Sequence, residues 1–233
     1  EWLSDKSRFV WDGLARQRLD KPYMRMGGKL VPTTWGEAFA AAQTALSVPA
    51  DKIGVVAGDL IEVEQAKAAL DLFRALGVQN TDCRPAGAAY GTDGVRERYI
   101  LNPTLMGVEE ADALLLIGTN PRVEAAVWNA RIRKSWLWGD LKVGLIGEAA
   151  DLTYDYDHLG TGGDALTNVA GSDFYKILKD AKRPMIVVGE GALCRADGEA
   201  ILSAALKLAQ DVGAVADGWA GFGVLHNAAG RVG

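Results

Sequence analysis

The side chains best suited to bind a metal or to act as a nucleophile are few and widely separated along this chain. They are two cysteines, Cys83 and Cys194, and two histidines, His158 and His226. A disulfide framework, a four-cysteine zinc site or a self-contained iron–sulfur cluster needs more cysteines at closer spacing, so the sequence excludes all three here. A serine nucleophile lacks support as well, because no Gly-x-Ser-x-Gly turn occurs. Cys83 follows an apolar run, so we expect a buried structural thiol there.

Glycine-bearing segments are the other candidates, because their backbones could bind a ligand. The first runs from Gly118 through Thr119, Asn120 and Pro121 to Arg122. Asn120 is predicted to be the N-cap of a helix, with proline at the first helical position. The free N–H groups of such a helix start suit a phosphate or a carboxylate. An ordinary capped turn without a ligand is the alternative that this pattern leaves open.

Two further glycine segments match phosphate-binding patterns less closely. Gly189 and Gly191 resemble the first two glycines of a dinucleotide-binding fingerprint, but Cys194 stands at the third position and Glu190 would repel a pyrophosphate. The segment 160–164 lacks the Gly-Lys-Ser/Thr ending of a P-loop, and we expect a flexible connection there. Taken alone, neither segment predicts a ligand.

Strands and helices that could position these segments alternate along the chain. Apolar runs predict strands at 53–57, 78–83, 113–117, 143–146 and 184–188. Start signals and helical periodicity predict helices at 34–46, from 59 to about 77, from 120 to about 136, at 172–181 and at 197–212. A hairpin is predicted at 23–32, around Gly27 and Gly28. Repeated strand–helix units imply parallel pairing, so the predicted fold class is α/β, with mostly parallel sheets and flanking helices.

Composition and charge exclude several functional classes. The chain has 233 residues, of which 49% are hydrophobic and 24% charged, and its formal net charge is −5. This excess of acids argues against a dedicated nucleic-acid binder. No apolar run approaches the ~18 residues of a membrane-spanning helix. The chain begins without methionine or a signal peptide and ends in an apolar, glycine-rich segment, so we expect a piece of a longer protein.

Four segments together resemble one family more specifically than any of them does alone. They are EWLSDKSRF at 1–9, DGLARQRL at 12–19, GTNPRVEAAVWNARIRK at 118–134 and VLHNAAGRVG at 224–233. These segments resemble the large iron–sulfur subunit of respiratory complex I, the NADH-quinone oxidoreductase. The middle of that subunit is similar to molybdopterin oxidoreductases such as formate dehydrogenase. The resemblance covers residues 1–233 and implies the α/β fold of domains II and III of those enzymes.

The resemblance also implies a discontinuous arrangement of domains. Residues 1–33 would form an arm and the hairpin. Residues 34–85 together with 184–233 would form a first α/β domain, and residues 86–183 would form a second α/β domain inserted between them. In this family the cysteine-rich iron–sulfur segments precede the region that matches Glu1, which would explain the shortage of cysteines.

Carried over residue by residue, the resemblance implies a vestigial cofactor site that lacks the metal ligand of the active enzymes. In active molybdopterin enzymes the stretch matching 84–90 supplies the Cys, Ser or selenocysteine that binds the metal. Here that stretch contains none of these residues and no histidine. The loop of Thr119, Asn120 and Pro121 matches the one that approaches the nucleotide part of the pterin cofactor. With Gly189 and Gly191, these residues are candidates for a vestigial binding loop.

The implied role is therefore structural, within an assembly that transfers electrons. We expect no catalytic residue, metal ligand or cofactor in this chain, because the parent subunit carries its 2Fe-2S and 4Fe-4S clusters elsewhere. The intact complex I passes electrons from NADH to quinone, and this region would belong to its peripheral arm on the cytoplasmic side of the bacterial inner membrane or the matrix side in mitochondria. The implied partners are other complex I subunits, chiefly the flavin- and NADH-binding module, with no nucleic acid and no direct membrane insertion.

Two other functions remain open from the residues. One is a working molybdopterin- or nucleotide-binding oxidoreductase domain, which the Asn120 helix start and the loop of Gly189 and Gly191 would support. The other is an unrelated α/β hydrolase or binding protein, which requires the match of all four segments to be accidental.

Overall fold

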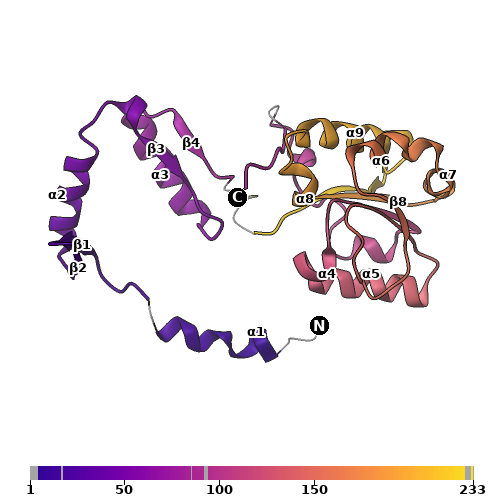
Figure 1. Ribbon diagram of the computed structural model, residues 1–233, viewed down its shortest axis with the longest axis horizontal. Helices are drawn as coiled ribbons and strands as arrows, with labels where there is room; N and C mark the ends of the chain where they lie inside the picture. Colours follow the sequence, from indigo (N-terminus) through magenta and orange to yellow (C-terminus); the bar gives the residue numbers. More distant parts are fainter. Residues whose placement is uncertain (1–4, 17, 85, 92–93, 229–231, 233) are drawn as a thin grey trace. The chain divides into compact units, whose positions relative to one another are not determined.

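The computed structural model describes residues 5–16, 18–84, 86–91, 94–228 and 232. Residues 1–4 of the first family motif, and 229–231 and 233 of the last, lie outside the described residues. The chain divides into two compact units (Figure 1): the first comprises Glu1–Val55 and Leu72–Asn80, and the second comprises Val56–Asp71 and Thr81–Gly233.

Helices and strands alternate through most of the chain, as the sequence predicts. The α-helices are α1 (Asp5–Phe9), α2 (Trp35–Ala45), α3 (Val63–Ala75), α4 (Pro121–Glu124), α5 (Ala126–Trp138), α6 (Gly163–Asn168), α7 (Asp173–Asp180), α8 (Glu190–Leu193) and α9 (Gly198–Asp211). The strands are β1 (Tyr23–Met26), β2 (Lys29–Pro32), β3 (Gly54–Val56), β4 (Asn80–Asp82), β5 (Ala113–Ile117), β6 (Lys142–Ile146), β7 (Asp157–Gly160), β8 (Pro184–Gly189), β9 (Val215–Ala216), β10 (Trp219–Ala220) and β11 (Phe222–Leu225). Short 3-10 turns are η1 (Val10–Ala15), η2 (Ala50–Lys52), η3 (Arg96–Arg98), η4 (Gly107–Glu109) and η5 (Val169–Gly171).

The predicted hairpin and the helix after it form part of the first unit. β1 and β2 pair antiparallel around Gly27 and Gly28, whose φ angles of 56° and 81° are those that a tight turn requires. α2 then starts with a capping box, because Thr34 accepts a hydrogen bond from the Glu37 N–H and the Glu37 carboxylate accepts one from the Thr34 N–H. Hydrogen bonds from the Thr33 hydroxyl and from Thr34 lower the pKa of Glu37 to about 2. The predictions for residues 23–46 are confirmed.

The boundary between the two units runs through β3, α3 and β4. β3 and β4 form a separate two-stranded sheet. α3 begins at Val63, later than the predicted start near 59, and the chain leaves it through Gly77, whose φ of 79° is typical of a helix C-terminus. Within the first unit, the Asn80 side chain donates to the carbonyl oxygen of Ile53 at 3.2 Å and so fixes the start of β3 next to β4.

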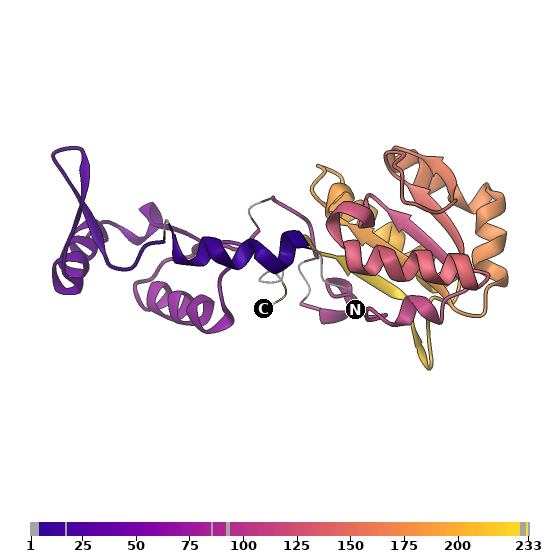
Figure 2. The same ribbon diagram turned by 90° about the horizontal axis from the view of Figure 1, so that it is seen from below.

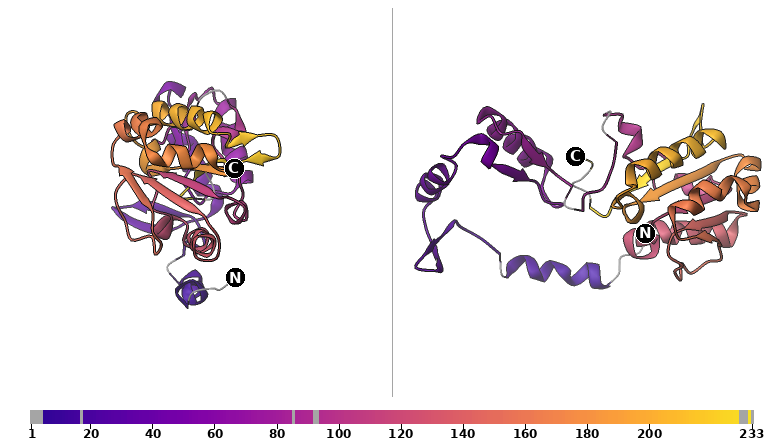
Figure 3. Two further views of the ribbon diagram at one scale, coloured as in Figure 1. Left: turned by 90° about the vertical axis from the view of Figure 1, so that its right-hand side faces the viewer. Right: turned by 45° about the horizontal axis from the view of Figure 1, so that its top comes forward.

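The second unit is built on a parallel sheet of five strands in the order β11-β8-β5-β6-β7. α4 and α5 cover one face of this sheet, and α6, α7 and α9 cover the other (Figures 1 and 3). Figure 2 looks onto the face that α5 covers. The α/β class with a parallel sheet and flanking helices is therefore confirmed.

The core of the second unit follows from the apolar sequence of the central strand, β5. Neighbouring side chains of a strand point to opposite faces of the sheet, so a strand buried on both faces must be apolar throughout. Leu115 and Ile117 belong to one buried cluster, which also contains residues of α6, α7 and α9. Leu114 and Leu116 belong to a second cluster, with Trp128 of α5. The sheet thus separates two layers of core.

One sheet contains strands from two of the segments that were expected to form separate domains. β8 and β11 come from the segment 184–233, which was expected to belong to the first domain, while β5, β6 and β7 come from the segment 86–183 expected to be inserted. β8 nevertheless pairs with β5 along its length, from Ala113 opposite Pro184 to Ile117 opposite Val188. Residue 183 therefore does not separate two sheets. Burial of β5 on both of its edges requires this pairing, since each neighbour satisfies one row of its backbone hydrogen bonds.

In the part of the chain that the structure describes, no helix combines the length and the apolar character needed to cross a membrane.

Candidate functional site

The carboxyl ends of the parallel strands define where a ligand site is expected. β5 continues into α4 and α5 on one face of the sheet, while its neighbour β8 continues into α8 and α9, and α9 lies on the other face. Chain connections that leave adjacent strands in opposite directions create a crevice between their ends, and ligands of open α/β sheets bind in such crevices. The loops after β5, β6, β7 and β8 all reach this edge.

A cavity of about 450 Å³ lies at this edge. Four loops and the helices that follow them line it: Ile117–Asn120 and Glu124 after β5; Ile146–Ala150 after β6; Thr161–Gly163 and Leu166 after β7; and Gly191, Ala192, Arg195 and Ile201 after β8. Its volume lies within the range of small-molecule pockets.

The structure brings most of the predicted loop candidates together here. Thr119, Asn120 and Gly191 line the cavity. Gly189 lies directly behind Thr119 and outside the lining, and Pro121 is buried at the start of α4. The residues predicted from separate segments are therefore neighbours, although two of them face protein and not the cavity.

Asn120 is the N-cap residue of α4 and Pro121 its first helical residue, as predicted, but the side chain of Asn120 does not act as a cap. The Asn120 side chain makes no capping hydrogen bond, and the predicted single helix is interrupted at Ala125, which separates α4 from α5. The carboxylate of Glu124 accepts a hydrogen bond from the Thr119 hydroxyl at 2.5 Å and one from the Asn120 N–H at 3.2 Å. It thereby ties the end of β5 to the first turn of the helix, as the acidic residue of a capping box does.

The glycines of this region allow the loops after β5 and β8 to touch. A Cβ on Gly118 would lie 2.5 Å from the Ala192 Cβ, and one on Gly191 would lie 2.6 Å from the Gly118 carbonyl oxygen. A Cβ on Gly189 would lie 2.4 Å from the Thr119 Cβ. All three distances are far below van der Waals contact. These glycines therefore serve the packing of one loop on the other, and the gap between β5 and β8 is filled by protein.

The loop after β6 is held in place by contacts to α4 and α5. Arg122 donates to the Asp151 carboxylate at 2.5 Å and to its carbonyl oxygen at 2.9 Å. Deeper in the core, the Tyr154 hydroxyl donates to Asn129 at 2.8 Å, and burial raises the pKa of Tyr154. Hydrogen bonds from the Thr153 N–H and from Arg122 lower the pKa of Asp151. This loop, with Glu148, is thereby fixed along the side of the cavity.

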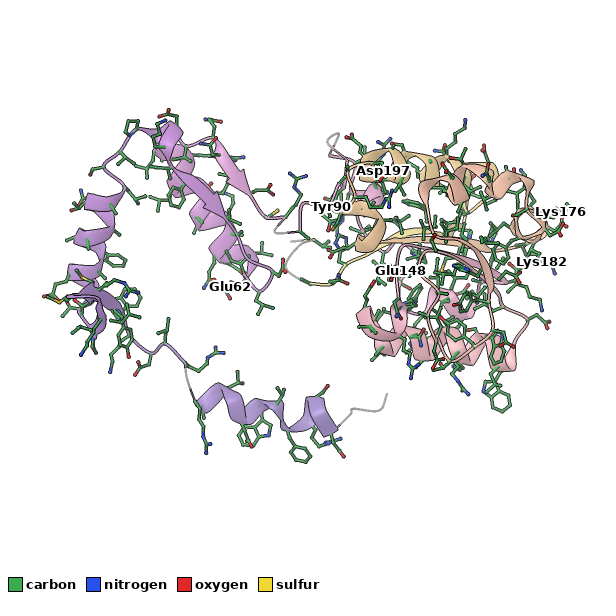
Figure 4. All side chains as sticks on the ribbon, in the orientation of Figure 1. Glu62, Tyr90, Glu148, Lys176, Lys182 and Asp197 are labelled. Atoms are coloured by element: carbon green, nitrogen blue, oxygen red, sulfur yellow. The ribbon has the colours of Figure 1, made fainter. Side chains whose placement is uncertain are left out.

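The charged groups around the cavity are mostly acids. Figure 4 shows Glu148 and Asp197 at the end of the unit where the strands finish, and Lys176 and Lys182 at the other end. Arg195 lines the cavity, but its guanidinium donates to both oxygens of Asp197, at 2.7 and 3.0 Å, and the side-chain hydrogen bond lowers the pKa of Asp197. The positive charge of Arg195 is therefore largely neutralised before any ligand arrives.

The stretch 84–90 packs against the same edge through α8. Pro85 lies outside the described residues. The Ala89 N–H donates to the Leu193 carbonyl oxygen at 3.0 Å, and the Tyr90 hydroxyl donates to Glu190 at 2.9 Å. Glu190 is only 4% exposed and also accepts from Asn227 at 2.8 Å. The carboxylate that sequence analysis expected to repel a pyrophosphate is thus buried within the protein.

Asp82 and Arg84, at the start of this stretch, form an exposed pair with two parallel hydrogen bonds. Arg84 donates to the two oxygens of Asp82 at 3.0 and 3.1 Å, and these bonds hold the pKa of Asp82 at about 2. A lowered carboxyl pKa stabilises the fold above the unfolded value of 3.8, and this contribution is lost as the pH falls from about 4 to about 2. The contribution to stability is small because both side chains are about half exposed.

Replacing Arg84 by methionine is expected to return the pKa of Asp82 towards 3.8, because the main donor to its carboxylate is removed. An NMR titration that follows the Asp82 carboxyl carbon measures this shift. Lys207→Met is the matched control, since it removes one exposed positive charge elsewhere and should leave the Asp82 titration unchanged. A pKa near 2 in the Arg84→Met variant would show that other groups hold the carboxylate in its charged form.

The cysteines and histidines do not converge. Cys83 and Cys194 are both exposed, so the prediction that Cys83 is buried is wrong: β4 ends at Asp82 and is exposed along its length. His158 contacts the Gly147 carbonyl oxygen, and the ring of His226 lies 5.0 Å from that of Tyr90. Among the described residues, no group of three or more His, Cys, Asp or Glu side chains could hold a metal ion.

Sequence reasoning missed two parts of the cavity. The loop after β6, with Gly147 and Glu148, was not singled out, and Arg195 was not considered. The segment 160–164 was expected to be a flexible connection, whereas Thr161, Gly162 and Gly163 line the cavity. Glycines at the ends of four strands were the available signal, because parallel strands bring their carboxyl ends to one edge: Gly118 and Gly147 follow β5 and β6, and Gly160 and Gly189 end β7 and β8.

Comparison with protein families identifies the class to which this fold and this edge belong. Residues 18–233 match the model described as molybdopterin oxidoreductase. The chain therefore belongs to the molybdopterin oxidoreductase family.

Within this family the chain is similar to the large iron–sulfur subunit of complex I, as the four motifs indicated. It is 43% identical over 242 residues to the NADH-ubiquinone oxidoreductase 78 kDa subunit of Neurospora crassa and 43% identical over 236 residues to the corresponding NADH-quinone oxidoreductase subunit of Rickettsia felis, with 100% of the chain covered in both cases. It is 41% identical over 229 residues, 97% of the chain, to the NADH dehydrogenase [ubiquinone] iron-sulfur protein 1 of Solanum tuberosum. The chain spans about a third of the length of these relatives, at 32%, 35% and 31%.

The residues at this edge do not fit the pyrophosphate-bearing cofactor that the family name implies. The donors that a phosphate would use after β5, the Thr119 hydroxyl and the Asn120 N–H, are bound to Glu124. The glycines that would let a cofactor approach the backbone are in contact with one another's loops. A phosphate would also meet Glu124 and Glu148, while the nearby Arg195 is already paired. Both the charge and the hydrogen bonding of these residues oppose the binding of a phosphate here.

Proposed function

We propose that this chain is the molybdopterin-oxidoreductase-like region of a complex I large iron–sulfur subunit, and that it acts as a non-catalytic structural domain of the peripheral arm. The similarity to complex I subunits along the whole chain supports the assignment. Electron transfer from NADH to quinone would then use flavin and iron–sulfur clusters carried outside this region. The loop of Thr119, Asn120, Pro121, Gly189 and Gly191 would be a vestige of a cofactor site.

One observation carries the non-catalytic part of this proposal: the Glu124 carboxylate occupies the hydrogen-bond donors of the loop after β5. A carboxylate supplied by the chain satisfies them permanently, because it is attached one turn away and need not be captured from solution. Two donors of this loop are thus engaged by a side chain of the same chain.

Exposed aromatic side chains in the first unit support a docking role among complex I subunits, chiefly the flavin- and NADH-binding module. Phe9, Trp11 and Leu14 are each more than 60% exposed, on α1 and η1. Large apolar side chains gathered on a short segment are typical of a surface that another protein covers. The peripheral arm lies on the cytoplasmic or the matrix side of the membrane, where such partners would be found.

The purified 233-residue chain is expected to contain no stoichiometric iron, acid-labile sulfide or molybdenum, and guanine nucleotides are expected to leave its thermal unfolding unchanged. The reason is that the described residues contain no metal-ligating cluster and that the Thr119 hydroxyl of the candidate loop is bound to Glu124. Elemental analysis and thermal unfolding measure these outcomes. A nucleotide at 100 times its dissociation constant would stabilise the fold by about 2.7 kcal/mol, so binding would be evident.

The alternative function, an active molybdopterin- or nucleotide-binding domain, predicts the opposite result. Bound molybdenum, or a stabilising shift with guanine nucleotides, would favour it. Stoichiometric iron would contradict the proposal that the clusters lie outside this region.

A further inference from the structure

The cavity at the carboxyl ends of the strands has an apolar interior and a polar mouth. Ile117, Ile146, Leu166 and Ile201 line it and are between 2% and 7% exposed. Glu148 lines the same space but is exposed, so it lies at the opening. A ligand with an apolar body and one polar end matches this arrangement.

Several hydrogen-bond donors around the cavity are already engaged within the protein. The Thr119 hydroxyl and the Asn120 N–H donate to Glu124. The Gly118 N–H donates to the Ile146 carbonyl oxygen at 2.8 Å, and the Gly147 N–H donates to the Gly160 carbonyl oxygen at 2.8 Å. A ligand made of acceptors, such as a phosphate, would find these donors occupied.

Acceptors, in contrast, remain available. The Oδ1 atom of Asn120 is buried and has no hydrogen-bond partner among the described residues. The Glu148 carboxylate makes no hydrogen bond or ion pair within the part of the chain that the structure describes. A buried acceptor without a donor is costly, and no donor of the described residues compensates the acceptor character of this side of the cavity.

The electrostatics favour a positive ligand. Glu124 and Glu148 line the cavity, and the one guanidinium in the lining, Arg195, is neutralised by Asp197. A bare metal ion fits less well than an organic cation, because no three His, Cys, Asp or Glu side chains converge among the residues described.

We propose that this cavity binds a small organic cation whose charged end carries N–H donors, such as an amidinium or a protonated amine on a flat apolar body. The charged end donates to the Glu148 carboxylate at the mouth, and the body packs against the isoleucine and leucine side chains inside. The proposal concerns the cavity alone and does not depend on the assembly to which the chain belongs.

Three molecules of nearly the same shape test this proposal by separating charge from fit. Benzamidine is a cation at neutral pH, benzamide is neutral and benzoate is an anion. Calorimetric titration of the 233-residue chain is expected to give affinities in that order, with benzamidine at least about tenfold tighter than benzoate. Inorganic pyrophosphate is expected not to bind.

Glu148→Gln provides the decisive variant, because Glu148 is exposed and its replacement keeps the shape of the side chain. Benzamidine affinity is expected to fall about tenfold, while benzamide affinity stays unchanged. Glu97→Gln is the matched control: it removes one exposed carboxylate outside the cavity lining and should leave both affinities unaltered.

Three results would each overturn the proposal: benzoate or pyrophosphate binding as tightly as benzamidine, equal effects of Glu148→Gln and Glu97→Gln, or no detectable benzamidine binding at millimolar concentration. None of these results would contradict the proposal that the chain is part of complex I, because that proposal rests on sequence similarity and on metal content.

Discussion

Replacing Gly189 by alanine is expected to destabilise the second unit by about 3 kcal/mol. A Cβ at this position would lie 2.4 Å from the Thr119 Cβ and 2.8 Å from the Gly118 carbonyl oxygen. The loop cannot withdraw, because β5 and β8, which end at this point, are buried and paired to each other. Denaturant unfolding followed by circular dichroism measures the loss.

Gly171→Ala is the matched control for this substitution. It also adds one methyl group to the second unit, but no heavy atom lies within 4 Å of the new Cβ, and Gly171 does not have a positive φ. Its effect is expected to stay within about 0.5 kcal/mol. Equal stability of the two variants would mean that the loops after β5 and β8 do not touch in solution.

This prediction bears on how the glycine spacing of the sequence is interpreted. Gly189 and Gly191 resemble part of a dinucleotide-binding fingerprint, in which glycines let a pyrophosphate approach the backbone. In this protein the approaching group is the loop that follows β5. The same residue spacing serves close contact in both cases, so spacing alone cannot distinguish a ligand cradle from two packed loops.

The strands of the sheet could be predicted because burial leaves a direct mark on sequence. β5 and β8 are apolar without interruption, as strands buried on both faces must be. The order of the strands could not be predicted, because each crossover can place the next strand on either side of the sheet. The crossover that leads to β8 places this strand next to β5, and this pairing determines where the loops after both strands lie. As a result, strands from both sides of residue 183 lie in one sheet.

Local signals failed where a distant or competing group decided the structure. Asn120 is the N-cap residue of α4, as its sequence predicts, but its side chain makes no capping hydrogen bond, and its own N–H donates to the Glu124 carboxylate. Cys83 was expected to follow a buried apolar strand, but β4 has the polar sequence Asn-Thr-Asp and is exposed, so the thiol is exposed as well. The pattern of apolar residues predicts which segment is a strand and not whether other elements cover it.

Individual residues of the candidate site could be predicted from the sequence, but their arrangement around one cavity could not. Thr119, Asn120 and Gly191 were identified as loop residues, and the structure places all three around one cavity. Glu148 carries no recognisable motif, because its position depends on the loop that Arg122 and Asp151 hold in place. Its acidic charge nevertheless changes the kind of ligand that the cavity favours.

Replacing Leu115 by alanine is expected to destabilise the second unit by about 3 kcal/mol, through lost burial and the cavity left in the core. Leu115 is fully buried in the central strand, opposite Gly144 of β6 and Ile186 of β8. Because β6 and β8 both pair with β5, the loss of stability should affect all three strands together. Hydrogen exchange followed by mass spectrometry is expected to show the same decrease in protection free energy in β6, β8 and β11.

This experiment also separates the observed sheet from the expected division into domains. If residues 86–183 folded as a domain independent of 184–233, Leu115→Ala would lower protection in β5 and β6 and leave β8 and β11 unchanged. Leu137→Ala, at a position that is 47% exposed, is the matched control and should change protection little in any strand. A uniform decrease means that the strands around the cavity form one cooperative unit, in which the loops lining the cavity are positioned together and can be lost only together.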